Sequence, residues 1–150
     1  MKCSRRVFVS RAGALLAGGS AAQWLAGCAA ATAYRVTPAG GQLQLDVASF
    51  RDLHSTAGIA TVQPDGDDVP IFIVRQNETY TALSAVCTHR GCTVEAKTGR
   101  FVCPCHGSTY SATGSVLRGP AEHPLRRIPS VLRADGRTLV IEHPRRTAAR

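Results

Sequence analysis

The sequence predicts a small all-β domain, and three observations point to that class. Apolar and polar residues alternate over short stretches, as they do in a strand with one buried face. Glycine, proline and aspartate separate these stretches and mark turns. No stretch after residue 34 repeats its apolar residues with the 3.6-residue period of a helix. The length of 150 residues suits one such domain.

The strands are predicted to follow a short linker over residues 35–42, which is too polar and too rich in glycine and proline for a helix. Leu43, Leu45 and Val47 alternate with mostly polar neighbours and predict the first strand. An apolar, β-branched run predicts a second strand at residues 70–74. The remaining strands are predicted at residues 79–86, 94–96, 100–102, 130–133 and 138–142, the last two joined by an Asp135-Gly136 turn.

The formal charge of +8 is concentrated at the two ends of the chain. Residues 1–27 carry four basic groups and no acidic group, and residues 144–150 form a basic tail with three arginines. Residues 28–143 hold 11 basic and 10 acidic groups, a net charge of +1. No nucleic-acid partner is expected, because phosphate binding needs lysine and arginine clustered on the folded body.

Residues 1–34 are typical of an export signal. Ser4-Arg5-Arg6-Val7-Phe8-Val9 resembles the bacterial twin-arginine motif, and an uncharged stretch follows it. Leu25-Ala26-Gly27-Cys28 resembles a lipobox, which implies lipidation of Cys28 and a membrane tether. Cleavage at Ala31-Thr32-Ala33, with release of a soluble protein, and an uncleaved membrane anchor are the alternatives. Each outcome places the domain on the periplasmic side of a bacterial membrane.

Four of the six cysteines lie within 19 residues, in Cys87-Thr88-His89-Arg90-Gly91-Cys92 and in Cys103-Pro104-Cys105-His106. Thiolates suit iron–sulfur clusters and zinc, and imidazoles suit zinc or iron. Zinc fingers usually pair cysteine with cysteine and histidine with histidine locally. Here each segment offers one cysteine, one histidine and a spare cysteine. A cluster with two cysteines on one iron and two histidines on the other fits that division, and the spare pair can form a disulfide.

These segments resemble the two cluster-binding loops of Rieske iron–sulfur proteins, C-T-H-x-G-C and C-P-C-H-G-S-x-Y. The resemblance covers residues 43–143 and implies a Rieske-type antiparallel β-sandwich with a [2Fe–2S] cluster. It implies that Cys87 and Cys103 bind one iron. His89 and His106 would bind the other.

The same resemblance assigns four further positions. Cys92 and Cys105 match the pair that forms the disulfide between the loops. Ser108 and Tyr110 match hydroxyl donors to a bridging sulfide and to a ligand thiolate. Two neutral imidazoles in place of thiolates raise the potential into a range of about −150 to +300 mV, and hydroxyl donors raise it further. A high-potential cluster is therefore expected.

Gly119-Pro120-Ala121-Glu122-His123-Pro124 resembles the third, proline-containing loop that covers the cluster in this family. His123 is expected to be a solvated loop residue. His54 and His143 have no partners at ligand spacing and are expected at the surface.

The resemblance implies one-electron transfer by a carrier or by a redox-complex subunit that has no substrate site of its own. The expected partners are a cytochrome, a quinol-oxidising complex or a molybdoenzyme. The Rieske subunit of a quinol–cytochrome c reductase is one alternative, but Arg90 stands where such subunits commonly carry leucine, and burying its charge in an apolar pocket would be costly. The small subunit of a periplasmic molybdenum oxidase is another. A structural zinc-binding module is the alternative outside redox chemistry.

Overall fold

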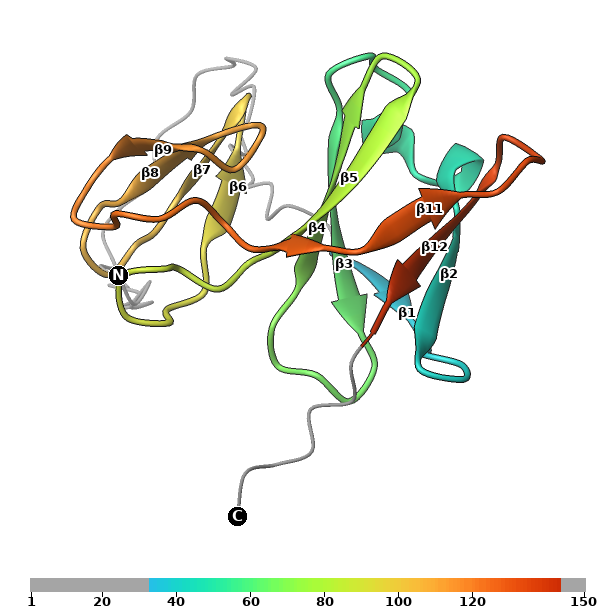
Figure 1. Cartoon of the computed structure of the whole chain (residues 1–150), viewed down its shortest axis with the longest axis horizontal. Helices are drawn as coiled ribbons and strands as arrows, with labels where there is room; N and C mark the ends of the chain where they lie inside the picture. The colour runs from blue at the N-terminus through green and yellow to red at the C-terminus, as the bar shows by residue number, and fades with distance from the viewer. Residues whose placement is uncertain (1–32, 144–150) are drawn as a thin grey trace, which may run out of the picture.

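The computed structural model describes residues 33–143, which form three β-sheets and two single-turn 3-10 helices (Figure 1). The first sheet has the order β1 (Ala33–Val36), β3 (Ile59–Pro64), β4 (Ile71–Gln76), β5 (Thr79–Ser84), β10 (Arg127–Ile128). The second has the order β11 (Ser130–Leu132), β12 (Thr138–Glu142), β2 (Gln42–Asp46). The third has the order β6 (Glu95–Lys97), β7 (Arg100–Val102), β8 (Thr109–Ser111), β9 (Val116–Arg118). The 3-10 helices span Val47–Ser49 and Arg51–Leu53.

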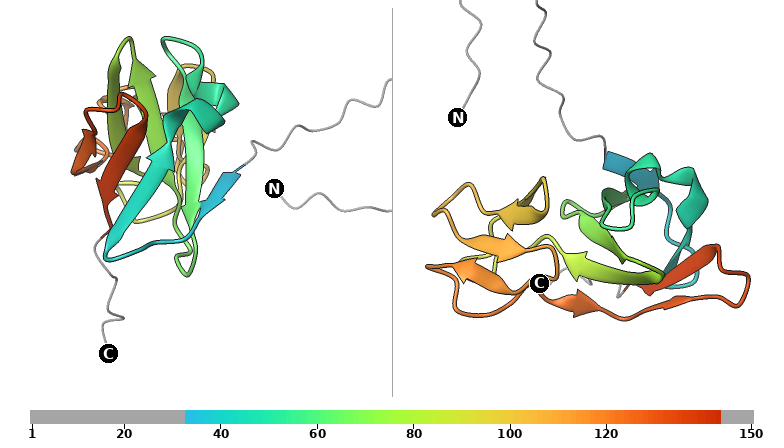
Figure 2. Two further views of the ribbon diagram at one scale, coloured as in Figure 1. Left: turned by 90° about the vertical axis from the view of Figure 1, so that its right-hand side faces the viewer. Right: turned by 90° about the horizontal axis from the view of Figure 1, so that it is seen from above.

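The described chain is all-β, which confirms the predicted class. All strand pairs are antiparallel except β1 with β3, which run parallel. Residues 85–126 leave the first sheet after β5 and return to it at β10, which is hydrogen-bonded to β5. We call this segment the insert. It contains the whole third sheet, which stands beside the other two in two perpendicular views (Figures 1 and 2).

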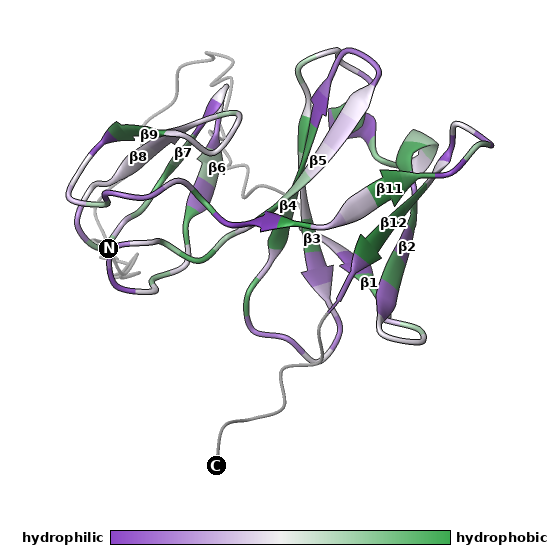
Figure 3. Cartoon of the chain, in the orientation of Figure 1, coloured by the Kyte–Doolittle hydropathy of each residue, from purple (hydrophilic) through white to green (hydrophobic). Residues whose placement is uncertain are grey.

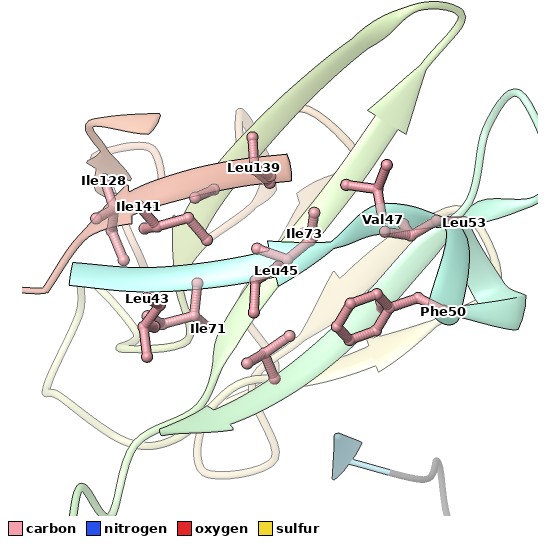
Figure 4. Packing of buried hydrophobic residues seen from close by; sticks show 13 residues of the cluster. Leu43, Leu45, Val47, Phe50, Leu53, Ile71, Ile73, Ile128, Leu139 and Ile141 are labelled. Atoms are coloured by element: carbon pink, nitrogen blue, oxygen red, sulfur yellow. The ribbon is translucent and has the colours of Figure 1, made fainter. Parts of the chain in front are cut away.

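Strand β4 lies in the middle layer of the molecule, and both of its faces are buried. Ile71 and Ile73 belong to a hydrophobic cluster formed with β2, β3, β5 and β12 (Figure 4). Phe72 and Val74, which point to the opposite face, belong to a second cluster formed with the insert. A strand covered on both faces reads as a continuous apolar run rather than an alternating one, and residues 71–74 have that pattern.

The two clusters join the insert to the rest of the fold. Phe72 of β4 stacks on Phe101 of β7, with ring centroids 4.5 Å apart and an angle of 17° between the planes. Strands β2 and β12 turn alternate apolar residues towards the first cluster, and the apolar stretches of these strands are visible when the ribbon is coloured by hydropathy (Figure 3). The loops that carry the predicted site therefore rest on an apolar layer shared with β4.

Four features differ from the expectations. Strand β1 begins at Ala33 and overlaps both the predicted signal and the predicted linker, because β3 offers it a parallel edge. Strand β3 was not predicted, since two of its three buried positions hold Ala60 and Pro64, which are disfavoured in strands. Strands β8, β9 and β10 were also not predicted. His143 is 8% exposed and lies inside the fold, where its Nε2 is 3.4 Å from Oδ2 of Asp67.

The predicted export signal, including Cys28, and the basic tail at residues 144–150 lie outside the described residues, apart from the two that β1 contains. Among residues 33–143, no helix is long and apolar enough to cross a membrane.

Candidate metal centre

The two predicted cluster-binding loops, residues 87–92 and 103–108, share one backbone arrangement. In the first loop, the N–H of Cys87 donates to the carbonyl of Cys92 at 2.8 Å. In the second, the N–H of Cys103 donates to the carbonyl of Ser108, also at 2.8 Å. Both bonds link residues five apart. The insert therefore presents two matching loops whose first residue is, in each case, an unpaired cysteine.

Gly91 and Gly107 occupy the same position in the two loops, and each has φ of +75°. Their N–H groups donate to the carbonyls of Cys87 and Cys103 at 2.9 and 3.0 Å. A Cβ at either glycine would meet no protein atom within 4 Å. The positive φ, rather than a close approach of other protein atoms, is therefore what favours glycine here.

A disulfide between Cys92 and Cys105 joins the two loops. Because it links the sixth residue of one loop to the third of the other, it fixes how the loops face each other. The Sγ atoms of Cys92, Cys103 and Cys105 all lie within 4.8 Å of one another. Two of these sulfurs belong to the disulfide and cannot act as thiolates, so Cys103 alone among the three remains available as a metal ligand.

Each loop contributes one free thiol and one imidazole. Cys87 and Cys103 are free thiols, 2% and 1% exposed. The rings of His89 and His106 are edge to face, with centroids 4.9 Å apart, and His106 is exposed. Nδ1 of His89 is a buried nitrogen with no hydrogen-bond partner in the described protein. A buried polar atom without a partner is costly, and a bond to a metal would satisfy it.

The hydroxyl of Tyr110 lies 3.2 Å from Sγ of Cys87 and is fully buried. It accepts a hydrogen bond from the N–H of Thr88 at 3.2 Å. Oγ1 of Thr88 lies 3.1 Å from the same hydroxyl and donates its own proton to the carbonyl of His123 at 2.6 Å. The Tyr110 hydroxyl can therefore donate its proton either to Oγ1 of Thr88 or to Sγ of Cys87, and a thiolate at Cys87 would attract it more strongly. Sequence reasoning did not identify Thr88, because its partner His123 is 35 residues away and only the folded chain brings it close.

Ser108 is likewise oriented by the third loop. It is fully buried, and its Oγ accepts a hydrogen bond from the N–H of Ala121 at 3.0 Å. With one acceptor position occupied, the Ser108 proton remains available for a different acceptor. The exposure of His123 and Glu122 on the same loop agrees with the expectation that His123 is solvated.

The surroundings of the two thiols shift their pKa values in opposite directions. Burial opposes ionisation of Cys87, but hydrogen bonds from Tyr110 and from the amides of His89 and Arg90 outweigh it and lower the pKa of the Cys87 thiol. Burial raises the pKa of Cys103, and the amide of Cys105 offsets only part of this effect. Burial and the bond to Cys87 also raise the pKa of Tyr110, which keeps that hydroxyl a donor at neutral pH.

The chain also matches a known protein family. Residues 45–129 match the family described as "Rieske [2Fe-2S] domain". The chain belongs to the Rieske [2Fe-2S] domain family, and its cofactor is a Rieske-type [2Fe–2S] cluster.

Several curated relatives are named as iron-sulfur subunits of a cytochrome b6-f complex. The chain is 42% identical over 81 residues to the "Cytochrome b6-f complex iron-sulfur subunit 1" of Nostoc sp. (strain PCC 7120 / SAG 25.82 / UTEX 2576), covering 51% of this chain and 45% of the relative. It is 35% identical over 95 residues to the "Cytochrome b6-f complex iron-sulfur subunit" of Chlorobaculum thiosulfatiphilum, covering 57% and 51%. The chain thus spans about half the length of these relatives.

Two solved structures are also similar. The plasma membrane Rieske protein PetC3 of Synechocystis PCC 6803 has 32% identity and a TM-score of 0.43, covering 67% of this chain and 85% of that chain. A chain of a hyperthermophilic respiratory Complex III has 28% identity and a TM-score of 0.49, covering 63% and 71%. The family assignment rests on the family match.

The donor set fits the cluster. It offers two buried free thiols and two neighbouring imidazoles, together with a disulfide between the loops and two buried hydroxyls. In a Rieske centre, histidine replaces cysteine on one of the two irons.

Proposed function

We propose that this chain transfers single electrons, with Cys87 and Cys103 holding one iron and His89 and His106 holding the other. The observation that carries the proposal is that two disulfide-linked loops each supply one buried free thiol and one imidazole, that the two imidazole rings lie edge to face, and that one of them has a buried nitrogen without a partner in the described protein. When bound, the cluster takes up and releases one electron at a time.

The chain supports that chemistry through its own residues. The exposed ring of His106 offers the edge through which an electron leaves, while Cys87 and Cys103 remain shielded from water. Tyr110 and Ser108 direct hydroxyl protons towards the site, where they stabilise added negative charge. These two donors should place the reduction potential of the cluster at the high end of the Rieske range.

Visible absorption and the EPR spectrum of the dithionite-reduced protein test this proposal. We expect a Rieske-type EPR signal and two irons per chain. A protein that is silent in both spectra and contains one zinc would contradict it. His106→Cys should lower the potential, since it adds negative charge to the cluster, and an unchanged potential would contradict the ligand set.

A role as a subunit of a quinol-oxidising complex is the second candidate, and the cytochrome b6-f relatives favour it. The exposed Arg90 beside His89 argues for a free carrier or a molybdenum oxidase subunit instead, since docking into an apolar membrane pocket would strip water from its charge. A pull-down from solubilised membranes separates these roles. Recovery of a cytochrome b supports the complex, recovery of a molybdenum subunit supports the oxidase, and recovery of neither supports the carrier.

We also propose that Arg5 and Arg6 direct twin-arginine export and that Cys28 is lipidated, which tethers the domain on the periplasmic side of a bacterial membrane. The Cys92–Cys105 disulfide supports export, because disulfides persist in oxidising compartments. Cys28→Ala should move the protein from the membrane fraction to the soluble periplasm. Unchanged membrane association would instead support an uncleaved anchor.

A further inference from the structure

The insert that carries the metal centre differs in charge from the sheets that support it. Residues 85–126 contain five basic and two acidic groups, a net charge of +3. The other described residues, 33–84 and 127–143, contain six basic and eight acidic groups, a net charge of −2. The near-neutral total therefore conceals a charge separation along the molecule.

Ion pairing increases this separation. In the insert, Lys97 pairs with Glu95 at 2.9 Å. The arginines of the insert are all exposed and form no ion pair with any described residue: Arg90, Arg100, Arg118 and Arg126. Glu122 is the only other acidic group there. Four unpaired cations thus face solvent against one unpaired anion.

The cationic groups begin next to the exposed edge of the metal centre. Arg90 directly follows His89 in the first loop, and Arg118 pairs in register with Thr109, three residues after His106. Exposed charges near a reactive edge steer partners of opposite charge and orient them on approach. The part of the surface that carries Arg90 and Arg118 is therefore suited to an anionic partner.

We propose that the insert docks an acidic one-electron carrier protein, with Arg90 at the contact, so that the His106 edge faces the partner's redox centre. This inference rests on the proposed electron-transfer function. The reduced cluster loses one electron and the oxidised partner gains it, with no bond formed or broken. A protein partner is favoured over an anionic membrane because Arg90 adjoins the loop edge through which the electron must leave, and a lipid headgroup accepts no electron.

Two forms of one protein provide a matched pair of probes. Horse cytochrome c is basic, and its fully succinylated form is acidic with the same haem. Stopped-flow mixing at about 10 mM ionic strength, where screening is weak, measures the rate at which the reduced full-length protein reduces each form. We expect the acidic form to be reduced about tenfold faster than the basic form, with the ratio falling towards one in high salt. Equal rates, or faster reduction of the basic form, would overturn the proposal.

Charge reversal locates the contact. Arg90→Glu should lower the rate ratio at least threefold, and Arg90→Lys should retain it. Arg133→Glu makes the same charge change in the exposed β11–β12 hairpin, at the opposite end of the molecule from the third sheet (Figure 1). It should change the ratio less than twofold. If Arg133→Glu acts as strongly as Arg90→Glu, net charge rather than this surface determines the preference, and the proposal is wrong.

A binding measurement separates this inference from the proposed function. Retention on resins that carry native or succinylated cytochrome c requires no electron transfer, and it should be stronger on the succinylated resin and lost in Arg90→Glu. Retention without any cluster spectrum would contradict the proposed function and leave the docking surface supported. A cluster spectrum without selective retention would contradict the docking surface alone. Arg90-dependent sedimentation with phosphatidylglycerol vesicles, without retention on the succinylated resin, would assign the surface to lipid and overturn the proposal.

Discussion

Ser108 and Tyr110 place similar hydroxyl groups in the site but are held in different ways. Tyr110 is oriented by Thr88, which belongs to the same loop as Cys87. Ser108 is oriented by the backbone of Ala121, which belongs to the third loop. The chemistry of each hydroxyl could be predicted from the Ser-x-Tyr spacing, whereas its orienting partner could not. A hydrogen-bond partner depends on which loop the fold brings near, and spacing along the chain does not encode that.

Ser108→Ala tests the role of this hydroxyl. We expect the reduction potential to fall by roughly 65 mV, which corresponds to about 1.5 kcal/mol for one hydrogen bond to a charged acceptor. The cluster should remain bound, since no ligand is changed. Protein-film voltammetry measures the potential, and Ser130→Ala in β11 is the distant control. Loss of the cluster from Ser108→Ala would mean that the hydroxyl is structural instead.

His143 shows where reasoning at the level of single residues fails. A histidine near the end of a chain, without a ligand-spaced partner, is expected at the surface. In the structure its backbone N–H donates to the carbonyl of Gly41 at 2.9 Å, and its ring lies against Asp67. Both partners come from turns that are more than 70 residues away in the chain. Its burial therefore follows from how distant turns meet, which no local pattern specifies.

At the scale of elements, the strands that were predicted are those whose pattern matches their burial. The run at 71–74 is apolar because β4 is covered on both faces, and β12 alternates because only one face is covered. Strand β3 was not predicted because Ala60 and Pro64, at two of its buried positions, are disfavoured in strands, and β1 because a parallel edge pairing leaves little trace in local sequence. Burial pattern is thus predictable, whereas pairing of distant edges is not.

The Cys92–Cys105 disulfide is the covalent link between the two cluster-binding loops. The Cys92→Ser/Cys105→Ser variant should lower the stability of the loops by about 3 kcal/mol, the entropy of closing a loop of this length. We therefore expect faster bleaching of the cluster's visible absorbance on warming. Dithiothreitol should accelerate bleaching of the wild-type protein in the same way and have no effect on the variant. Equal bleaching rates in variant and wild type would show that the loops hold the cluster without the disulfide.

The turn between β11 and β12 makes a pH-dependent contribution to stability. Amide and hydroxyl groups of Thr138 and the amide of Arg137 donate to Asp135, and these bonds lower the pKa of its carboxyl to about 2. Since the pKa of an unfolded aspartate is about 3.9, this contribution is complete above about pH 4. It is lost as the pH falls through about 2.

Asp135→Ala should therefore lower the Tm at neutral pH, and the gap from the wild type should narrow between about pH 4 and pH 2. Asp68→Ala is the control, because Asp68 is exposed and makes no hydrogen bond or ion pair with the described residues. Thermal unfolding followed by circular dichroism measures both. A gap that stays constant with pH would assign the effect to the backbone of the turn and not to the carboxylate.

At the scale of the whole molecule, the hydrophobic core consists of two clusters, one next to the metal centre and one between the supporting sheets. One cluster contains Cys87, Cys103 and Tyr110 together with residues of β4 and β5. The other contains thirteen buried residues and none of the proposed ligands (Figure 4). The sequence could indicate one small domain, but it could not indicate two cores, because both use alternate residues of the same strand β4.

This division predicts how the protein responds to loss of iron. The first cluster, which contains Ile71 and Ile73, keeps its apolar contacts without the iron–sulfur cluster, so the first and second sheets should remain folded. The loops should loosen, because the apo-site leaves two thiols and the Nδ1 of His89 without their ligand. Far-UV circular dichroism of chelator-treated protein should change little, while amide exchange should accelerate at Gly91 and Gly107 far more than at Ile73 and Ile141. Equal acceleration at all four amides would show instead that the cluster and both cores unfold as one cooperative unit.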